Sequence, residues 1–413
     1  MKKMSEKTNI PQIRFKGFND VWEQCKLNDL GVSTSGTSIE SEFSDEGVYN
    51  VISIGSYSED SIYNDQGIKA IHSSKTENRV LDKGDLTMIL NDKTQAGRIL
   101  GRVLLIEKSS KYVYNQRTQR IQPYKNKFSS EFLYHLLNAP LVRNKIIKQS
   151  QGNTQIYVNW SAIKETEYFV PNLVEQEKLG QMFSKINDLI TLHQRKHEKY
   201  TNIKKALLEK IFPQNGEKIP QIRFKGFTEA WEQCKLEDIA DIYDGIHETP
   251  NYKSEGIMFL SVEDITTLVS NKYISFEDFR RLYKVYPQKD DILMTRIGDV
   301  GTPNVVENTD LLAYYVSLAL IKPKKIDSYY LSNCICSTSF QNDLKQRTLT
   351  TAIPQKINKD QIGKIIVNFP SNKSEQILIG GLFSNLDNLI TLHQRECEKL
   401  KNIKKSLLEK MFV

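Results

Sequence analysis

The chain has 413 residues, 39% of them hydrophobic, with a net charge of +7 and a pI of about 8.8. This composition is typical of a globular protein long enough for two or more domains, and it excludes a disordered chain. The mild excess of positive charge is compatible with a nucleic-acid partner but does not identify one.

The cellular context can be narrowed from the cysteines and from the apolar runs. The five cysteines are odd in number and form no Cys-x-x-Cys pair, which argues against a disulfide framework or a zinc ribbon. No apolar run approaches the roughly 20 residues of a membrane span. The charged residues 1–12 are not followed by an apolar segment, so we expect no signal peptide and a cytoplasmic protein.

Two segments of the sequence occur twice, about 200 residues apart. Residues 10–27 and 219–236 are identical at 15 of 18 positions, and residues 189–211 and 389–411 at 17 of 23. The stretches between the repeated segments share only scattered matches. A constant frame around two different inserts predicts one scaffold that presents two recognition surfaces.

The two inserts, roughly residues 32–172 and 241–369, have the pattern of mixed α/β segments with short strands. The predicted strands are 48–54 and 102–106 in the first insert, and 257–262 and 315–321 in the second. Weak matches recur at a constant offset of 199, such as Asn159 with Asn358. The inserts are therefore expected to share one fold and to differ in their surface loops.

A long helix is predicted after each insert. Between Glu175 and Ile211 the only Gly or Pro is Gly180, and apolar residues recur at alternating spacings of four and three. The predicted seam is Met182, Ile186, Leu189, His193, Lys196, Tyr200, Ile203 and Leu207, repeated at Leu382, Leu386, Leu389, His393, Glu396, Leu400, Ile403 and Leu407. A single polar helix of this length needs a partner. We expect the two copies to pair antiparallel, with Lys196 and Glu396 favouring the unlike pair.

The whole chain resembles the specificity subunit of a type I restriction–modification system. Four features carry the resemblance: the duplicated segment Pro11–Trp22 and Pro220–Trp231, the phrase from Gly152 to Gln176 that closes the first insert, the loop phrase Asp291–Gly301, and the two long helices. No single motif decides it, but the duplicated order is specific to this family.

The resemblance implies an α/β (α+β) fold in which two repeated target recognition domains are separated by two long helices in an antiparallel coiled coil with pseudo-twofold symmetry. The expected domains are 1–172, with a flexible tail at 1–9, then 173–214 as central helix, 215–370, and 371–413 as C-terminal helix. Each domain would read one half of a bipartite asymmetric DNA site. The helices would set the spacer between the halves and dock the partners. The implied partners are double-stranded DNA, two methyltransferase subunits that use S-adenosylmethionine, and two motor-nuclease subunits that use ATP and Mg; this chain itself would hold no cofactor.

Candidate DNA-contacting residues lie in loops where basic, amide and hydroxyl side chains gather, because Arg can read guanine and Gln or Asn adenine by bidentate hydrogen bonds. In the first insert the candidates are Lys93, Thr94, Gln95, Arg98, Arg102, Arg117, Gln119, Arg120, Gln151, Asn153, Thr154 and Gln155. In the second insert they are Arg296, Asp299, Thr302, Asn304, Arg347, Thr350, Thr351, Gln355 and Lys356. Which of them touch bases and which touch phosphates is open at this stage.

The main alternative is a stand-alone DNA-modifying enzyme, such as a fused methyltransferase and nuclease. The nearest match to an amino-methyltransferase tetrapeptide is Asn368-Phe-Pro-Ser371, which lacks the second proline and the aromatic residue. The nearest match to a phosphate loop, Gly31 to Thr37, has no lysine. We therefore expect a chain without catalytic residues.

Two further patterns have a plain structural reading beside a functional one. His193 and His197, repeated as His393 and Cys397, have a spacing that metal ligands can use, but polar seam residues are the favoured reading and no metal is expected. The pair Lys204-Lys205, with its copy Lys404-Lys405, could contact phosphates, although a solvated helix face is favoured.

Overall fold

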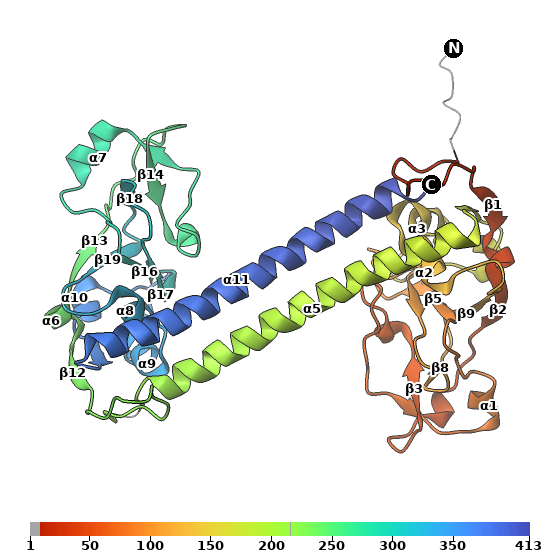
Figure 1. The fold of residues 1–413 in the computed structure, drawn as a ribbon, viewed down its shortest axis with the longest axis horizontal. Coiled ribbons are helices and arrows are strands. Elements are labelled where there is room, and N and C mark those ends of the chain that lie inside the picture. Colours follow the sequence, from red (N-terminus) through yellow and green to blue (C-terminus); the bar gives the residue numbers. More distant parts are fainter. Residues whose placement is uncertain (1–8, 215) are drawn as a thin grey trace, which may run out of the picture. The chain divides into compact units, whose positions relative to one another are not determined.

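The computed structural model describes residues 9–214 and 216–413. The chain forms two compact units, of which the first is Met1–His193 with Arg395–Val413 and the second is Gln194–Gln394. The two longest helices, α5 (Leu173–Ile211) and α11 (Lys373–Lys410), each begin in one unit and end in the other (Figure 1). Of the expected N-terminal tail, residues 1–8 lie outside the described residues.

The first unit is built around a four-stranded antiparallel sheet. The strands of the whole unit are β1 (Glu23–Lys26), β2 (Gly31–Ser35), β3 (Tyr49–Ile52), β4 (Lys69–Ala70), β5 (Leu86–Ile89), β6 (Asn91–Asp92), β7 (Val103–Leu105), β8 (Tyr112–Tyr114), β9 (Thr118–Pro123), β10 (Ile156–Tyr157) and β11 (Glu167–Val170). The main sheet has the order β2-β9-β5-β7, and a second sheet has the order β4-β3-β8 with β3 and β8 parallel. The pairs β1-β11 and β10-β6 complete the unit.

The second unit repeats this topology. Its strands are β12 (Glu232–Lys235), β13 (Ala240–Asp244), β14 (Ile257–Leu260), β15 (Tyr273–Ile274), β16 (Ile292–Ile297), β17 (Asp299–Val305), β18 (Leu312–Tyr314), β19 (Leu318–Pro323) and β20 (Ile366–Phe369). The sheet orders are β13-β19-β16-β17, β15-β14-β18 and β12-β20. Each order matches one in the first unit strand for strand, which confirms that the two inserts share a fold.

Short helices connect the strands. In the first unit they are η1 (Leu27–Leu30), η2 (Glu40–Glu42), η3 (Ile54–Ser56), α1 (Ser74–Glu77), α2 (Ser130–Asn138), α3 (Pro140–Ile147) and α4 (Trp160–Ile163). In the second unit they are α6 (Leu236–Ile239), η4 (Val262–Asp264), α7 (Phe276–Leu282), α8 (Ser328–Ile335), α9 (Thr338–Arg347) and α10 (Lys359–Gly363). Serine or aspartate side chains accept N-cap hydrogen bonds at α2, α8 and α9, as these residue types commonly do.

The core of each unit contains the tryptophan of the repeated segment and the aromatic residue that follows the far end of a long helix. In the first unit, Trp22 packs edge-on against Phe132 and Phe412, and all three side chains are at most 2% exposed. In the second unit, Trp231 packs edge-on against Phe212. Because both rings of each pair are large and apolar, their burial ties the repeated segment and the helix end into one core.

The repeated segment also clamps the start of the other long helix. Arg14 donates from Nε and Nη2 to the two carboxylate oxygens of Glu175, both at 2.7 Å, and the Glu175 side chain is fully buried. The Ile13 amide donates to the Lys410 carbonyl at 3.1 Å, so the same segment holds the last turn of α11. We call this arrangement the first clamp.

The second unit contains the same clamp. Arg223 donates to Glu375 at 2.7 and 2.9 Å, and the Ile222 amide donates to the Lys210 carbonyl at 3.0 Å. The hydrogen bond to each glutamate raises the pKa of the paired arginine, so both guanidinium groups stay charged. The near identity of the two 18-residue segments thus has a structural cause, since each performs the same joining task.

The long helices contact each other within each unit. In the second unit, the rings of Tyr200 and His393 stack with centroids 5.6 Å apart, and Lys204 Nζ lies 2.6 Å from Asp387 Oδ1. A later residue of α5 therefore meets an earlier residue of α11, which means that the helices run in opposite directions there. The ion pair gives Lys204 a structural partner on the other helix, and its side chain is 23% exposed, so Lys204 lies at the contact between the helices and not on the solvated face that the sequence favoured.

The predicted seam shares every second position with the seam in the structure, and at positions between them, such as Leu189 and Glu396, the buried residue is the next one along the chain. Leu189 is 44% exposed, whereas Ile190 is 7% exposed; likewise Ile403 is 41% exposed, and Cys397 rather than its neighbour Glu396 is buried. Both registers satisfy a heptad repeat through shared positions such as Tyr200. The adopted register buries Cys397 where the predicted one would bury the charged Glu396, whereas Leu189 and Ile190 are both apolar.

Candidate nucleic-acid interface

In the first unit, the fold brings together two polar segments that are about 60 residues apart in sequence. Strand β10 pairs antiparallel with β6, so that Ile156 lies opposite Asp92 and Tyr157 opposite Asn91. Gln151 and Tyr157 exchange backbone hydrogen bonds at 2.9 and 3.0 Å, which closes a hairpin. Residues 93–98 and 151–155 therefore flank one small sheet, and we call their shared surface the first loop edge.

The loop at 93–98 is shaped from inside by a buried aspartate. Asp92, 3% exposed, accepts hydrogen bonds from the Thr94 amide and hydroxyl at 2.9 and 3.0 Å, and from the Ile99 amide at 2.9 Å. An aspartate that accepts from the residue two positions later is a common local turn. Because the aspartate holds both ends of the loop, the side chains of Lys93, Gln95 and Arg98 remain exposed.

An arginine that the sequence reasoning missed supports the same loop from α3. Arg143 donates to the carbonyls of Leu100 and Arg98, each at 2.9 Å, and to that of Gly97. Burial, followed by the nearby charge of Arg102, lowers the pKa of Arg143 to about 10, so it stays positively charged at neutral pH. Arg143 lies about 45 residues from the loop in sequence, and no local pattern links the two, so the sequence alone could not identify it.

A cleft of about 450 Å³ opens beside the first loop edge. One wall is formed by η3 and the residues that follow it, including Tyr57 and Glu59, and the other by Lys93, Thr94 and Arg98. Arg98 Nη1 lies 3.1 Å from Glu59 Oε1 across this opening, and both side chains are more than half exposed. An exposed pair of this kind contributes little to stability, so either side chain is available to a ligand.

The second unit has the corresponding arrangement at the turn between β16 and β17. The Gly298 amide donates to the Gln355 carbonyl at 2.9 Å, and Gln355 Nε2 donates to the Gly298 carbonyl at 3.1 Å. Leu349 and Lys356 close a hairpin by mutual backbone hydrogen bonds, as Gln151 and Tyr157 do in the first unit. We call the surface of residues 297–299 and 350–355 the second loop edge.

Most of the predicted contact residues are accessible. The exposed ones are Lys93, Thr94, Gln95, Arg98, Arg117, Gln151, Asn153, Thr154, Gln155, Asp299, Thr350, Thr351, Gln355 and Lys356. The half-buried ones are Arg102, Arg120, Thr302, Asn304 and Arg347. The fold gathers 93–98 with 151–155 and 297–299 with 350–355, so most of the exposed candidates belong to the two loop edges.

Two predicted residues lie in the interior. Gln119 is 1% exposed, and its Oε1 accepts a hydrogen bond from Ser35 Oγ at 2.7 Å. Arg296 is 6% exposed and forms an ion pair with Asp244 of β13. Gln119 Oε1 and the Arg296 guanidinium thus face partners within the protein, although Arg296 Nε is buried without a hydrogen-bond partner among the described residues. Both remain predicted DNA contacts, but neither offers a free side chain to a ligand.

Several half-buried candidates are also engaged inside the fold. Arg120 Nε donates to Asp85 Oδ2 at 2.8 Å, and Asn304 Nδ2 donates to the Ile265 carbonyl at 2.8 Å. Arg347 Nε donates to Asp343 Oδ1 at 2.6 Å, one turn earlier on α9. Because these three side chains already bind partners within the fold, fewer of the predicted residues are free to contact DNA.

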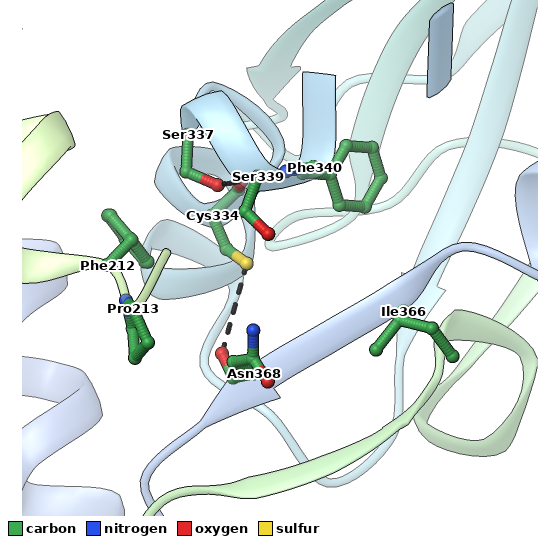
Figure 2. Close-up of a pocket in the computed structure, with 8 residues that line it drawn as sticks. All are labelled: Phe212, Pro213, Cys334, Ser337, Ser339, Phe340, Ile366 and Asn368. Carbon is green, nitrogen blue, oxygen red and sulfur yellow. Dashed lines mark hydrogen bonds between the residues drawn. The ribbon is translucent and has the colours of Figure 1, made fainter. Parts of the chain in front are cut away.

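The second unit contains a small cavity that has no room for a ligand. It lies around the Cys334 thiol, whose Sγ is 4.0 Å from the Asn368 carbonyl, and its volume is about 10 Å³, the size of one water molecule (Figure 2). Burial raises the pKa of Cys334 to about 12, which keeps the thiol protonated and unreactive. Among the described residues, no three His, Cys, Asp or Glu side chains are placed to share a metal ion.

Comparison with known proteins identifies the family. The family model for the type I restriction modification DNA specificity domain matches the chain twice, at residues 19–202 and 228–402. The type I restriction enzyme MjaVIII specificity subunit of Methanocaldococcus jannaschii is 22% identical over 303 residues, which are 69% of this chain and 70% of that protein.

Solved structures agree at the level of the fold. The S subunit of a type I system from M. genitalium has a TM-score of 0.64 at 16% identity, covering 98% of this chain and 99% of that one. A chain from a study of complex assembly and conformational transition of the type I system has a TM-score of 0.50 at 16% identity, covering 94% and 97%. No helix in the described residues is long and apolar enough to cross a membrane. Because the two matched segments cover most of its length, the chain belongs to the type I restriction–modification DNA specificity family.

Proposed function

We propose that the chain is the DNA-reading subunit of a type I restriction–modification complex, and that each unit reads one half of a bipartite, asymmetric site. The observation that carries this proposal is the loop edge, which occurs twice on the same topology with different side chains. The first loop edge offers Lys93, Gln95 and Arg98 with the amides of 151–155, and the second offers Asp299 with Thr350 and Gln355. Different donors and acceptors on one scaffold read different base pairs.

Phosphate contacts would supply affinity beside this base readout. Lys93 is an exposed lysine of the first loop edge, the exposed Lys356 directly follows the second loop edge, and the chain carries a net charge of +7. Exposed lysines that neutralise phosphates release counterions, so binding should weaken as salt rises. Lysine contacts of this kind position a protein on DNA without selecting a sequence.

The long helices would form an antiparallel coiled coil that fixes the distance between the two reading heads, with pseudo-twofold symmetry between the units. The stacking of Tyr200 on His393 and the ion pair of Lys204 with Asp387 support opposite helix directions in the second unit. In the first unit, Phe183 of α5 stacks on Phe412, which follows α11, with centroids 5.5 Å apart. Each helix of 38–39 residues spans about 58 Å, the length of about 17 base pairs of B-DNA.

Catalysis would reside in the partner subunits. Two methyltransferase subunits that bind S-adenosylmethionine, and two motor-nuclease subunits that use ATP and Mg, would assemble on this chain. The duplicated frame supports this composition, since two equivalent surfaces can bind two equivalent subunits. The chain itself would then carry no catalytic residue and no cofactor.

Methylation by purified components tests the proposal. With S-adenosylmethionine and DNA, the chain alone should transfer no methyl group, whereas the chain with its methyltransferase subunit should methylate adenine within a two-part sequence. Sequencing of modified bases in the product DNA gives both half-sites and their spacing. Methyl transfer by the chain alone would favour a stand-alone enzyme, and a continuous rather than bipartite site would refute two separate reading heads.

A further inference from the structure

Arg117 differs from the other arginines of the first recognition domain, residues 9–172. Within the described part of this domain, the Arg117 side chain is exposed and has no hydrogen-bond or ion-pair partner. The other six arginines there have a partner: carboxylates pair with Arg14, Arg98 and Arg120, while backbone or hydroxyl oxygens accept from Arg79, Arg102 and Arg143. Arg98 can leave its exposed partner Glu59, but Arg117 alone among the seven arginines described there has no internal partner to give up for an external acceptor.

The turn that carries Arg117 is strained and fixed. Arg117 has a φ of +66°, in the left-handed region that non-glycine residues seldom adopt. The Asn115 side chain accepts from the Ile39 amide at 3.1 Å, and the Gly36 amide donates to the Thr118 carbonyl at 2.8 Å. A Cβ at Gly36 would come within 2.1 Å of the Asn115 carbonyl oxygen, so only glycine permits this approach. The backbone of the turn is thus held in place while the arginine side chain is free.

The turn lies next to the first loop edge. The Leu90 amide donates to the Arg117 carbonyl at 2.9 Å, and the Leu90 carbonyl accepts from the Val158 amide at 2.9 Å. Leu90 therefore joins the Arg117 turn directly to the strand that follows residues 151–155. It also immediately precedes β6, from which the loop 93–98 starts. Three polar segments thus converge around one short stretch of backbone.

The second unit has a different residue at the equivalent position. There the Arg296 amide donates to the Ser317 carbonyl at 2.9 Å and the Arg296 carbonyl accepts from the Ile357 amide at 3.0 Å, which places Ser317 where the first unit has Arg117. Ser317 is 6% exposed, and its hydroxyl accepts from the Val262 amide at 3.2 Å. The same backbone contact therefore presents a free guanidinium in one unit and a small inward hydroxyl in the other.

We propose that Arg117 reads a guanine in the half-site of the first unit, through paired hydrogen bonds from its guanidinium to O6 and N7, and that the second unit has no counterpart of this contact. The inference rests on the proposed DNA-reading function and names the residue and base that set part of its specificity. A free, exposed arginine on a rigid turn beside amide-rich loops suits this contact, because bidentate arginine–guanine pairing is the commonest specific contact in the major groove.

Three variants in the complete complex test the assignment by sequencing of methylated adenines. Arg117→Lys keeps the charge and loses the fork, whereas Arg117→Gly accepts the positive φ without strain and should fold at least as well as the wild type. Arg281→Ala is the matched control, since it removes an exposed arginine, held by Asp278, from the second unit.

The wild-type half-site of the first unit should contain a required guanine. Both Arg117 variants should lose roughly 5- to 150-fold of the preference for that base, with the other half-site unchanged and the control unaffected. Full retention of the preference by Arg117→Gly, which has no side-chain donor, would show that Arg117 does not read this base and would overturn the inference, as would a half-site without guanine. A wild-type complex that methylates without a defined site would overturn both the inference and the proposed function; a defined site that Arg117 variants read unchanged would overturn the inference alone.

Discussion

The first clamp gives a sharp prediction about stability. Arg14→Met should destabilise the first unit strongly, because it leaves the carboxylate of Glu175, fully buried and held by two hydrogen bonds of 2.7 Å, without its cation. Removing one partner of a buried ion pair typically costs about 3–5 kcal/mol. For a unit of about 210 residues, each kcal/mol lowers the Tm by about 2 °C, so the transition of this unit should fall by about 6–10 °C.

Differential scanning calorimetry of the purified chain measures this shift, and two matched variants interpret it. Arg223→Met removes the equivalent arginine from the second clamp and should lower the transition of the second unit by a similar amount. Arg14→Met combined with Glu175→Leu removes both charges and should recover most of the loss, because no unpaired carboxylate remains. A fall of less than about 2 °C in Arg14→Met, or a double variant no better than the single one, would refute the reasoning.

Further predictions concern acid stability, helix packing and the spacer. Burial lowers the pKa of His135, which is 2% exposed, to about 3. The neutral, buried imidazole therefore contributes fully to stability above the unfolded pKa of about 6.5, and this contribution is lost as the pH falls toward 3. Urea denaturation from about pH 7 to about pH 4 should show the free energy of unfolding decline, and His135→Leu should flatten that decline. In α11, Gly381→Ala should stabilise by about 1 kcal/mol in urea denaturation, since its Cβ meets nothing within 4 Å, whereas Gly380→Ala should not, because its Cβ would come within 3.0 Å of three atoms. Seven residues inserted after Leu192 and after Leu392 keep the heptad and lengthen each helix by about 10 Å, so the spacer mapped by methylation should grow by about three base pairs.

The repeated architecture could be predicted because duplication is visible directly in the sequence. The near-identical segments defined the frame, and weak matches such as Asn159 with Asn358 indicated that the inserts share a fold, which the matching sheet orders confirm. The seam was predicted only in part, since a doublet such as Leu189-Ile190 satisfies two heptad registers equally. Packing against the partner helix, which the sequence does not contain as a local signal, selects between them.

The candidate site was predicted as a set of residues but not as a surface. The pairing of β6 with β10 joins residues about 60 positions apart, and no local pattern announces it. The burial of Arg296 depends on Asp244, a residue of another strand. The support that Arg143 gives to the first loop edge has the same origin, since a helix far away in sequence supplies it. Contacts of this kind follow from the tertiary fold alone.

The central claim is that the two units read their half-sites independently, and an exchange of one insert tests it most directly. Residues 32–172 would be replaced by the corresponding insert of another family member, with both repeated frames kept, and the methylated sites of the complete complex would be sequenced. The account predicts that one half-site changes to that of the donor, while the other half-site and the spacer stay as they were. A variant complex that remains active but changes both half-sites, or neither, would contradict it.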